Sequence, residues 1–422
     1  MPYSHFYIFN PIDLKSNQDE RNYPSDHSSQ TFISSDSSEE FNMLNFWDNE
    51  EIFLDGDQYF DHLIKDMAAA KTTITVEMYI FNDDLLGKRI VEALILASQR
   101  SVKVQVIIDG VGSYLFYDKI HGLLKSYGIS VKMYNPLPFF HPYRGQLTLI
   151  KRLHVFLMRM WRLNKRNHRK IITIDQSIMY AGSFNFMVES TSMHTQTPWK
   201  DMGVKVSGEN VQFAVLQFKR VWKLREYYRF KKKIKKMSFS YWKDFPLRLN
   251  QTLLMKIYFY RDFLNKINHA EKRVWLMTPY FIPKRSLIRV LGKAAKRGVD
   301  VRVLISSKSD VKIFRTLQYF YYPYLIKKGV KVYHYDKTVL HAKNHIIDNW
   351  TTIGSSNLNH RSFLHDLEFD LVIQDEKNIK ILEEHFVDAT MPHTMLTTES
   401  LKKRALLDQF LSRIFFLFKY WF

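Results

Sequence analysis

One motif occurs twice in this chain, and the repeat limits the folds that the chain can adopt. Each copy reads His-x-Lys, then Asp five residues after the Lys, then Gly-Ser-x-Asn six or seven residues after the Asp. The polar residues of the first copy are His168, Lys170, Asp175, Ser183 and Asn185, and those of the second are His341, Lys343, Asp348, Ser355 and Asn357. A lysine-rich chain of 422 residues could contain one such motif by chance, but not two with the same tail. The repeat therefore predicts two related halves.

The residues after each lysine predict a buried strand with the polar groups on one face. Ile171, Ile172 and Ile174 follow the first motif lysine, and Ile346 and Ile347 follow the second. Short apolar runs rich in β-branched residues are typical of buried strands. On such a strand, residues two apart share a face, so the histidine and the lysine of each motif point the same way.

Imidazole, ammonium, hydroxyl and amide groups that converge on one spot suit the chemistry of a phosphate ester. Lysine and neutral donors stabilise charge on the phosphate oxygens, and an imidazole can attack phosphorus. One motif supplies one histidine, whereas two halves that face each other supply a nucleophile and a general acid and base. We therefore expect a single site built from both motifs.

Alternating strands and helices precede each motif, and the two series align. Residues 100–104 match 297–301, and residues 128–132 match 329–333. We expect strands at 72–81, 102–109, 129–134, 274–281, 299–305 and 330–335, and helices at 59–70, 85–99, 287–296 and 319–328, with a further helix ending at 123–127. The pattern predicts two similar α/β domains around a pseudo-twofold axis, with the site at their interface.

The paired motifs resemble those of the phospholipase D superfamily, and further segments are similar to its bacterial cardiolipin synthases. The segment Pro279-Tyr280-Phe281-Ile282-Pro283 looks like the Pro-Tyr-Phe-x-Pro segment of these enzymes. So does Gly354-Ser355-Ser356-Asn357-Leu358-Asn359 with Glu368 downstream. The chain is most similar, over about residues 46–422, to the short members that lack N-terminal transmembrane helices. The resemblance implies two phospholipase D-like α/β domains, each a mixed sheet flanked by helices.

The resemblance also implies roles for the motif residues. His168 would be the nucleophile and His341 the general acid and then base, although the symmetry of the motifs allows the reverse order. Residues expected near the phosphate are Lys170, Lys343, Asn185, Asn357, Ser183 and Ser355. No metal or other cofactor is expected, because the two-histidine mechanism requires none.

Three kinds of acidic residue belong to the expected site. Glu189 and Glu368 match the family's downstream acids, which orient an imidazole. Asp175 and Asp348 complete the catalytic motifs, but their place after a strand favours a structural role in the turn. Glu77 ends a core strand near the site, and whether it lines the site is left open.

Composition suggests a partner with negative charge. The chain has a formal net charge of +20 and 15% aromatic residues, which suits an anionic membrane surface or a nucleic acid. Cysteine is absent, which excludes disulfides and thiolate chemistry and fits a reducing compartment. The N-terminus has no basic and apolar pattern of a signal peptide, and no uncharged apolar run reaches 18 residues, so we expect no transmembrane helix.

Changes in composition along the chain predict its division. We expect a disordered, serine-rich leader at 1–45, a first domain at 46–236, a second domain at 237–395 and a membrane-associating tail at 396–422. In the first half, 40 residues separate Gly128 from His168, whereas 12 separate Gly329 from His341 in the second. The first domain therefore carries an insertion of 28 residues within about 137–165.

Three basic segments with apolar faces are candidates for membrane contact. Residues 150–166 form a predicted amphipathic helix without acids, residues 213–237 contain ten Lys or Arg and one acid, and residues 400–422 place large apolar residues on one helical face. Each could instead pack on the core or form a solvated face. Contact with an anionic bilayer is the sharper hypothesis.

The favoured function is that of a peripheral cardiolipin synthase at the cytoplasmic face of the cell membrane, with phosphatidylglycerol as its substrate. A hydrolytic phospholipase D, or a phosphatidyltransferase for another alcohol, is the alternative, because water and a lipid hydroxyl compete for the same intermediate. A nuclease of the superfamily is less favoured, since the apolar face of 400–422 suits lipid better than nucleic acid. A non-catalytic membrane protein would require a broken motif, and neither motif is broken.

Overall fold

The computed structural model describes residues 46–138, 149–193, 195–223, 245–308, 312–391 and 394–402, together with residues 412 and 414. Residues 43–422 belong to one compact unit. The expected leader and most of the expected C-terminal tail lie outside the described residues, as do residues 224–237 of the second basic segment.

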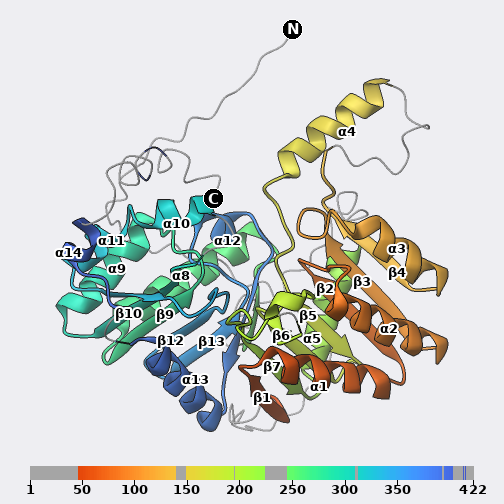
Figure 1. The fold of residues 1–422 in the computed structure, drawn as a ribbon, viewed down its shortest axis with the longest axis horizontal. Coiled ribbons are helices and arrows are strands. Elements are labelled where there is room, and N and C mark those ends of the chain that lie inside the picture. The colour runs from red at the N-terminus through yellow and green to blue at the C-terminus, as the bar shows by residue number, and fades with distance from the viewer. Residues whose placement is uncertain are drawn as a thin grey trace, which may run out of the picture. The chain divides into compact units, whose positions relative to one another are not determined.

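The first half is built on a seven-stranded mixed sheet (Figure 1). Its strands are β1 (Asn49–Phe53), β2 (Thr73–Met78), β3 (Lys103–Asp109), β4 (Ser130–Tyr134), β5 (Ile171–Ile174), β6 (Ile178–Gly182) and β7 (Gly203–Ser207). The helices are α1 (Gly56–Ala69), α2 (Leu85–Gln99), α3 (Tyr117–Ser126), α4 (Leu149–Arg162) and α5 (Val211–Trp222), with a 3-10 turn, η1 (Val188–Ser190). The strand order is β1-β7-β6-β5-β2-β3-β4, with β2, β3 and β4 parallel and the other neighbours antiparallel.

The second half repeats this plan. Its strands are β8 (Leu247–Leu249), β9 (Arg273–Thr278), β10 (Asp300–Ser306), β11 (Lys331–Tyr335), β12 (Asn344–Ile347), β13 (Trp350–Gly354) and β14 (Phe369–Ile373). Its helices are α8 (Leu253–His269), α9 (Arg285–Lys296), α10 (Lys312–Gln318), α11 (Tyr322–Lys327), α12 (His360–Leu364), α13 (Glu376–Ala389) and α14 (Thr398–Lys402). The order β11-β10-β9-β12-β13-β14-β8 equals that of the first sheet once each strand is replaced by its counterpart. The predicted fold of two similar, mixed-sheet α/β halves is confirmed.

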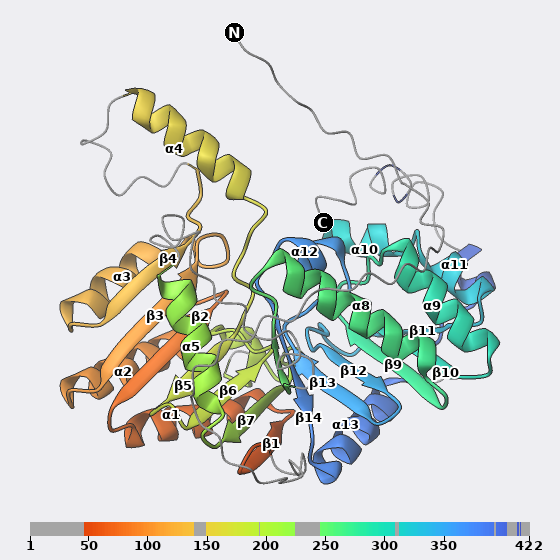
Figure 2. The same cartoon turned by 180° about the vertical axis from the view of Figure 1, so that it is seen from behind.

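Of the three largest apolar clusters among the described residues, one lies within each half and one lies between them. In the first half, Leu63 and Ile90 of the helices pack against the sheet, and in the second Ile267 and Leu291 do the same. A third cluster of buried apolar residues takes members from both sheets, including Met179, Val204, Ile353 and Leu371. Figure 2 shows the two sheets side by side, with β13 near β6 and β7. Because this cluster buries apolar surface from both halves, the hydrophobic effect holds them together.

Each motif aspartate closes the turn at the far end of its strand. Asp175 and Asp348 adopt the left-handed backbone conformation, with φ of 50° and 48°, which Asp tolerates better than most residues. The Asp175 carboxylate accepts hydrogen bonds from the backbone N–H groups of residues 71, 72 and 73 at 2.7–3.0 Å. Asp348 accepts from residues 271, 272 and 273, each at 2.9 Å. Both carboxylates therefore tie the hairpin to the neighbouring strand.

The predicted amphipathic helix of the insertion is present as α4 (Figure 1). Its exposed side chains include Leu157, Met158 and Met160, and Arg159 and Arg162 lie in its last turn. Among the helices that the structure describes, none has both the length and the apolar character that crossing a membrane requires.

Replacing Asp175 by Ala removes the acceptor of three backbone N–H groups. We expect the free energy of unfolding to fall by about 1–3 kcal/mol, with Asp175→Asn less affected because it keeps one acceptor oxygen. Turnover measured well below the unfolding temperature should remain, and Asp348→Ala should behave in the same way. A variant that unfolds at the wild-type temperature but has lost turnover would show that the aspartate acts in the chemistry.

Candidate active site

The two histidines precede strands at equivalent places in the two sheets. His168 and Lys170 lead into β5, and His341 and Lys343 lead into β12. Each strand is central in its sheet and fully buried, as its β-branched residues predict. The strands therefore fix the backbone from which the histidine and lysine side chains extend.

Each histidine is hydrogen-bonded to a carboxylate of the other half. The Nδ1 atom of His168 lies 3.0 Å from Oε2 of Glu368, which belongs to the second half. The Nδ1 atom of His341 lies 2.6 Å from Oδ1 of Asp201, which belongs to the first. All four side chains are buried or nearly so. The halves thus exchange carboxylates, and neither histidine is oriented by its own half alone.

Backbone hydrogen bonds join the halves at the same two places. The His168 N–H donates to the carbonyl of Leu367 at 2.9 Å, and the Leu367 N–H donates to the carbonyl of Arg166 at 2.8 Å. In the other direction, the N–H groups of His341 and Ala342 both donate to the carbonyl of Lys200 at 2.8 Å. Leu367 and Lys200 each precede one of the exchanged carboxylates, so the same segments position both the acid and the histidine.

Neighbouring side chains hold both carboxylates in place. Ser355 donates to Oε2 of Glu368 at 2.5 Å, and Ser362 donates to Oε1 at 2.6 Å. Ser190 donates to Oδ2 of Asp201 at 2.9 Å. These bonds occupy the lone pairs that face away from the histidines, so each carboxylate is held in one orientation.

The lysines and asparagines of the motifs lie close to the histidines. Lys170 donates to the carbonyl of His168 at 2.8 Å, and Lys343 donates to that of His341 at 2.6 Å. The charge of Lys343 lowers the pKa of His168, and that of Lys170 lowers the pKa of His341, so the motifs share one electrostatic site. Asn185 accepts from the backbone of Ile80 at 3.2 Å, and the side-chain oxygen of Asn357 is buried without a partner among the described residues.

Burial sets the charge states of the site. Desolvation lowers the pKa of His168 to about 4, even though Glu368 raises it. Desolvation also lowers the pKa of His341, against the effect of Asp201. Burial alone would raise the pKa of Glu368, but the charge of His168 and their hydrogen bond outweigh it and lower that pKa to about 2. Near pH 7 the first half of the site therefore holds an ionised Glu368 beside a neutral His168.

This arrangement can perform phosphoryl transfer. With Nδ1 bound to a carboxylate, Nε2 is the ring nitrogen of each histidine that remains for a substrate. The carboxylate stabilises the positive charge that develops when Nε2 attacks phosphorus or accepts a proton. Burial also lowers the pKa of Lys170, and an anionic phosphate would oppose that effect by favouring the charged ammonium.

Comparison with known proteins agrees with this geometry. The family model described as "Cardiolipin synthase, PLD-like domain" matches residues 63–222 and 263–389. The chain belongs to this family. Cardiolipin synthase B of Salmonella typhi is 31% identical over 77% of this chain and 76% of its own length. The cardiolipin synthase of Listeria welshimeri is 30% identical over 86% of this chain and 73% of its own. The chain is accordingly an enzyme of the phosphatidyltransferase type.

Two solved structures share the fold. Phosphatidylserine synthase of Haemophilus influenzae superposes with a TM-score of 0.62 at 14% identity, over 88% of this chain and 95% of that one. Polyphosphate kinase of Porphyromonas gingivalis superposes with a TM-score of 0.54 at 12% identity, over 80% of this chain and 50% of that one. At these identities the likeness concerns the fold alone.

Glu189, which was expected to orient an imidazole, makes no hydrogen bond to either motif histidine among the described residues. Glu189 lies in η1, and its Oε2 atom is buried without a hydrogen-bond partner among the described residues. Asp201 is the acid that is hydrogen-bonded to His341. Gly182 pairs with Gly203 and Gly354 pairs with Asp370, so Asp201 and Glu368 lie at equivalent positions, two residues before the paired one. The sequence feature that could have identified Asp201 is an acidic residue just before a strand of alternating burial. A fixed spacing from the motif asparagine does not identify it.

Other expected residues act as supports, and the Ser355 carbonyl also lies 3.1 Å from Nδ1 of His168. Ser183 accepts from the Met202 N–H at 3.1 Å, as Ser355 accepts from Phe369 at the same distance in the other half. Both hydroxyls thus contact the segments that carry the exchanged acids. Asp175 and Asp348 lie at the far ends of their strands, and a strand rise of about 3.3 Å per residue puts each roughly 15 Å from its motif lysine.

The surroundings of the two motifs differ in charge. Glu77 accepts from Asn167 at 2.9 Å and lies 3.8 Å from Arg169, and Asp109 accepts from the Asn167 N–H at 2.8 Å. The equivalent positions in the second half are Met277, Ser306, Leu340 and Ala342. Glu77, left open from sequence, therefore supports the segment around His168 and does not contact the imidazole.

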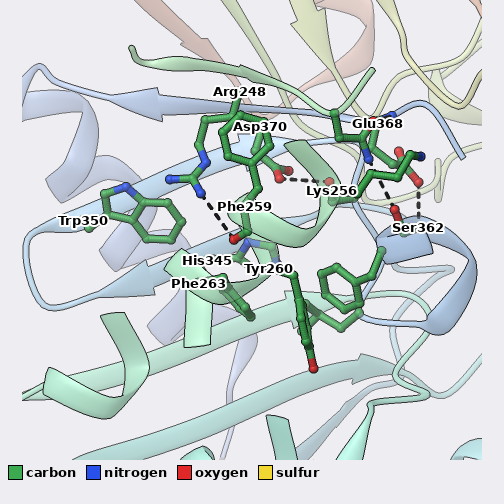
Figure 3. Close-up of a pocket in the computed structure, with 14 residues that line it drawn as sticks. Arg248, Lys256, Phe259, Tyr260, Phe263, His345, Trp350, Ser362, Glu368 and Asp370 are labelled. Atoms are coloured by element: carbon green, nitrogen blue, oxygen red, sulfur yellow. Dashed lines mark hydrogen bonds between the residues drawn. The ribbon is translucent and has the colours of Figure 1, made fainter. Parts of the chain in front are cut away.

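A cavity in the second half lies behind Glu368 (Figure 3). Lys256, Ser362 and Glu368 lie at one end of it and Arg248 and Trp350 at the other. His345 also lines this cavity, with Nδ1 3.2 Å from the Thr352 hydroxyl. In the parts of the chain described here, no trio of His, Cys, Asp or Glu is arranged to hold a metal.

The exchange of carboxylates predicts unequal effects for two acids. Asp201→Asn should lower kcat/KM by about 10²–10⁴-fold, because His341 loses the charge that orients it and favours its protonated form. Glu189→Gln should leave kcat/KM close to wild type, since no hydrogen bond joins its carboxylate to His341 among the described residues. Steady-state kinetics of both variants, with thermal unfolding as a control for folding, tests this. A large loss in Glu189→Gln with little loss in Asp201→Asn would contradict the assignment.

Proposed function

We propose that this enzyme transfers a phosphatidyl group from one phosphatidylglycerol to another, which makes cardiolipin and releases glycerol. The exchange of Glu368 and Asp201 between the halves is the observation that carries the proposal, because it makes two oriented imidazoles available to one phosphate. The names of the relatives as cardiolipin synthases support the choice of lipid substrate.

In the first step, Nε2 of His168 attacks the phosphorus of the donor phosphatidylglycerol. The bond between phosphorus and the glycerol oxygen breaks, and His341 in its protonated form gives its proton to that oxygen. Glycerol leaves, and the phosphatidyl group remains bound to His168. Glu368 stabilises the charge that the His168 ring acquires.

In the second step, the terminal hydroxyl of another phosphatidylglycerol attacks the same phosphorus. Neutral His341 takes the hydroxyl proton, the bond between phosphorus and Nε2 breaks, and cardiolipin forms. His168 is neutral again and His341 is protonated again, so the site returns to its starting state. One phosphodiester replaces another, and the exchange consumes no nucleotide.

The asymmetry of the site supports His168 as the nucleophile. Its pKa of about 4 leaves the imidazole neutral near pH 7, as a nucleophile must be. The buried bonds of Asn167 and Arg169 fix the adjoining backbone on both sides. Lys170, Lys343, Asn185 and Asn357 hold the phosphate oxygens, and the two ammonium groups offset the phosphate charge without a metal.

We further propose that the enzyme is a peripheral protein of an anionic membrane and acts at its cytoplasmic face. The exposed apolar side chains of α4 lie on the same helix as Arg159 and Arg162. Such a helix lies in the interface, with apolar groups toward the acyl chains and basic groups toward anionic headgroups. The segments 213–237 and 400–422 add positive charge of the same kind.

His168→Ala and His341→Ala should each lower turnover by several orders of magnitude, because attack on phosphorus and proton transfer are both needed. Purified protein is incubated with phosphatidylglycerol vesicles, and the products are separated by thin-layer chromatography and identified by mass spectrometry. His345→Ala is the matched control and should retain most of the activity of a folded enzyme.

Cardiolipin and glycerol are the products expected of the wild-type enzyme. Formation of phosphatidic acid without cardiolipin would show that the enzyme hydrolyses the lipid and does not transfer the phosphatidyl group to another lipid. Near-normal turnover in either motif variant would contradict the two-histidine mechanism.

A further inference from the structure

A cluster of basic residues lies beside the His168 side of the site and has no role in the steps above. It takes members from four segments of the chain, namely Lys165, Lys256 of α8, Lys284 before α9, Arg361 of α12 and His365 after it. Lys165 is three residues from His168, and the charge of Lys256 acts on that of Glu368. Figure 3 shows Lys256 next to Glu368 at one end of the cavity.

Contacts between these segments hold the cluster together. Lys256 donates to the carbonyl of Asp366, and Arg361 lies 3.3 Å from the Asp366 carboxylate. Lys284 lies 4.7 Å from the centre of the Tyr260 ring, which packs 4.5 Å from that of Phe363 in α12. The aromatic rings thus connect Lys284 to the helix that carries Arg361.

The cluster has more positive than negative charge. Among the described residues, Asp366 is the one acid whose carboxylate pairs with a member of the cluster, namely Arg361, and its Oδ1 atom already accepts from the Arg166 N–H at 3.0 Å. No acidic side chain among the described residues pairs with Lys165 or Lys284. Burial makes the largest contribution to the lowered pKa of His365. The positive charges of Lys256, Arg361, Lys165 and Lys284 lower this pKa further. An anion bound here would relieve the repulsion between these groups.

We propose that this cluster, and Lys165 and Lys284 in particular, binds the phosphodiester of the acceptor lipid during the second step. The inference rests on the proposed function, in which the acceptor is itself an anionic lipid. Its attacking hydroxyl is separated from its own phosphate by one glycerol unit, so a second phosphate must lie near the first while the hydroxyl attacks. The motif lysines hold the donor phosphate, and the acceptor phosphate requires cations of its own.

The test compares an anionic acceptor with a neutral one in the same enzyme. Full-length Lys165→Ala/Lys284→Ala is incubated with vesicles of phosphatidylglycerol and a neutral phospholipid, with ethanol added as a competing acceptor. Cardiolipin formation should fall by about 10- to 100-fold, whereas formation of phosphatidylethanol should fall much less. Ethanol has no phosphate, so its attack does not need the cluster.

Lys272→Ala/Lys296→Ala is the matched control. This variant removes the same amount of positive charge at two exposed positions. Lys296 is the last residue of α9 and lies about 18 Å along the helix axis from Lys284, which precedes α9. It should keep the wild-type ratio of the two products. Vesicle flotation of all variants shows whether membrane binding changes.

Equal losses of cardiolipin and phosphatidylethanol, or no loss of either, would overturn the subsite while leaving the proposed function intact. Inorganic phosphate added to the wild-type enzyme should reduce cardiolipin formation selectively. An equal effect on both products would place the free phosphate at the donor site held by the motif lysines; the selective effect that an acceptor subsite requires would then be missing, which also overturns the proposal. A wild-type enzyme that makes phosphatidylethanol but no cardiolipin would remove the proposed function and the acceptor subsite together.

Discussion

The site depends on the exchange of carboxylates between the halves. Glu368 of the second half binds His168 of the first, and Asp201 of the first binds His341 of the second. The backbone hydrogen bonds at Leu367 and Lys200 fix these contacts, and the shared apolar core keeps the halves in register. A domain on its own would contain a histidine and an acid, but not a pair that acts together. Two domains are thus the smallest unit that can complete the site.

Burying so many ionised groups costs free energy, which the hydrogen bonds between them offset. Around His168 the cost is largest, since Glu77, Asp109 and Arg169 are buried there as well as Glu368. The second motif has a methionine, a serine and an alanine at the equivalent positions, so its surroundings are less charged. The histidines of the two motif copies therefore lie in different environments. This difference suits different roles in one reaction.

Much of the fold was predictable because local patterns determine it. The β-branched run after each motif lysine and the aligned segments before it predicted central strands and flanking helices, and both are present in the structure. Of the four edge strands, β4 and β11 were predicted, but β1 and β8 were not, since their partners β7 and β14 lie far along the chain. For the site, the repeat indicated which histidines and lysines converge, but Asp201 was missed because no common spacing marks the two acids: Asp201 lies 16 residues after Asn185, whereas Glu368 lies 11 residues after Asn357. The cluster around Lys284 likewise depends on tertiary packing that no spacing in the sequence reveals.

The pH dependence of kcat/KM in Glu368→Gln, compared with Asp201→Asn, tests the exchange most directly. Each carboxylate raises the pKa of the histidine it contacts, so its removal lowers that pKa. If His168 must be neutral and His341 protonated, Glu368→Gln shifts the acid limb to lower pH, and Asp201→Asn shifts the alkaline limb to lower pH. Each variant should leave the other limb nearly unchanged. A shift of the same limb in both variants, or of neither limb, would contradict the exchange.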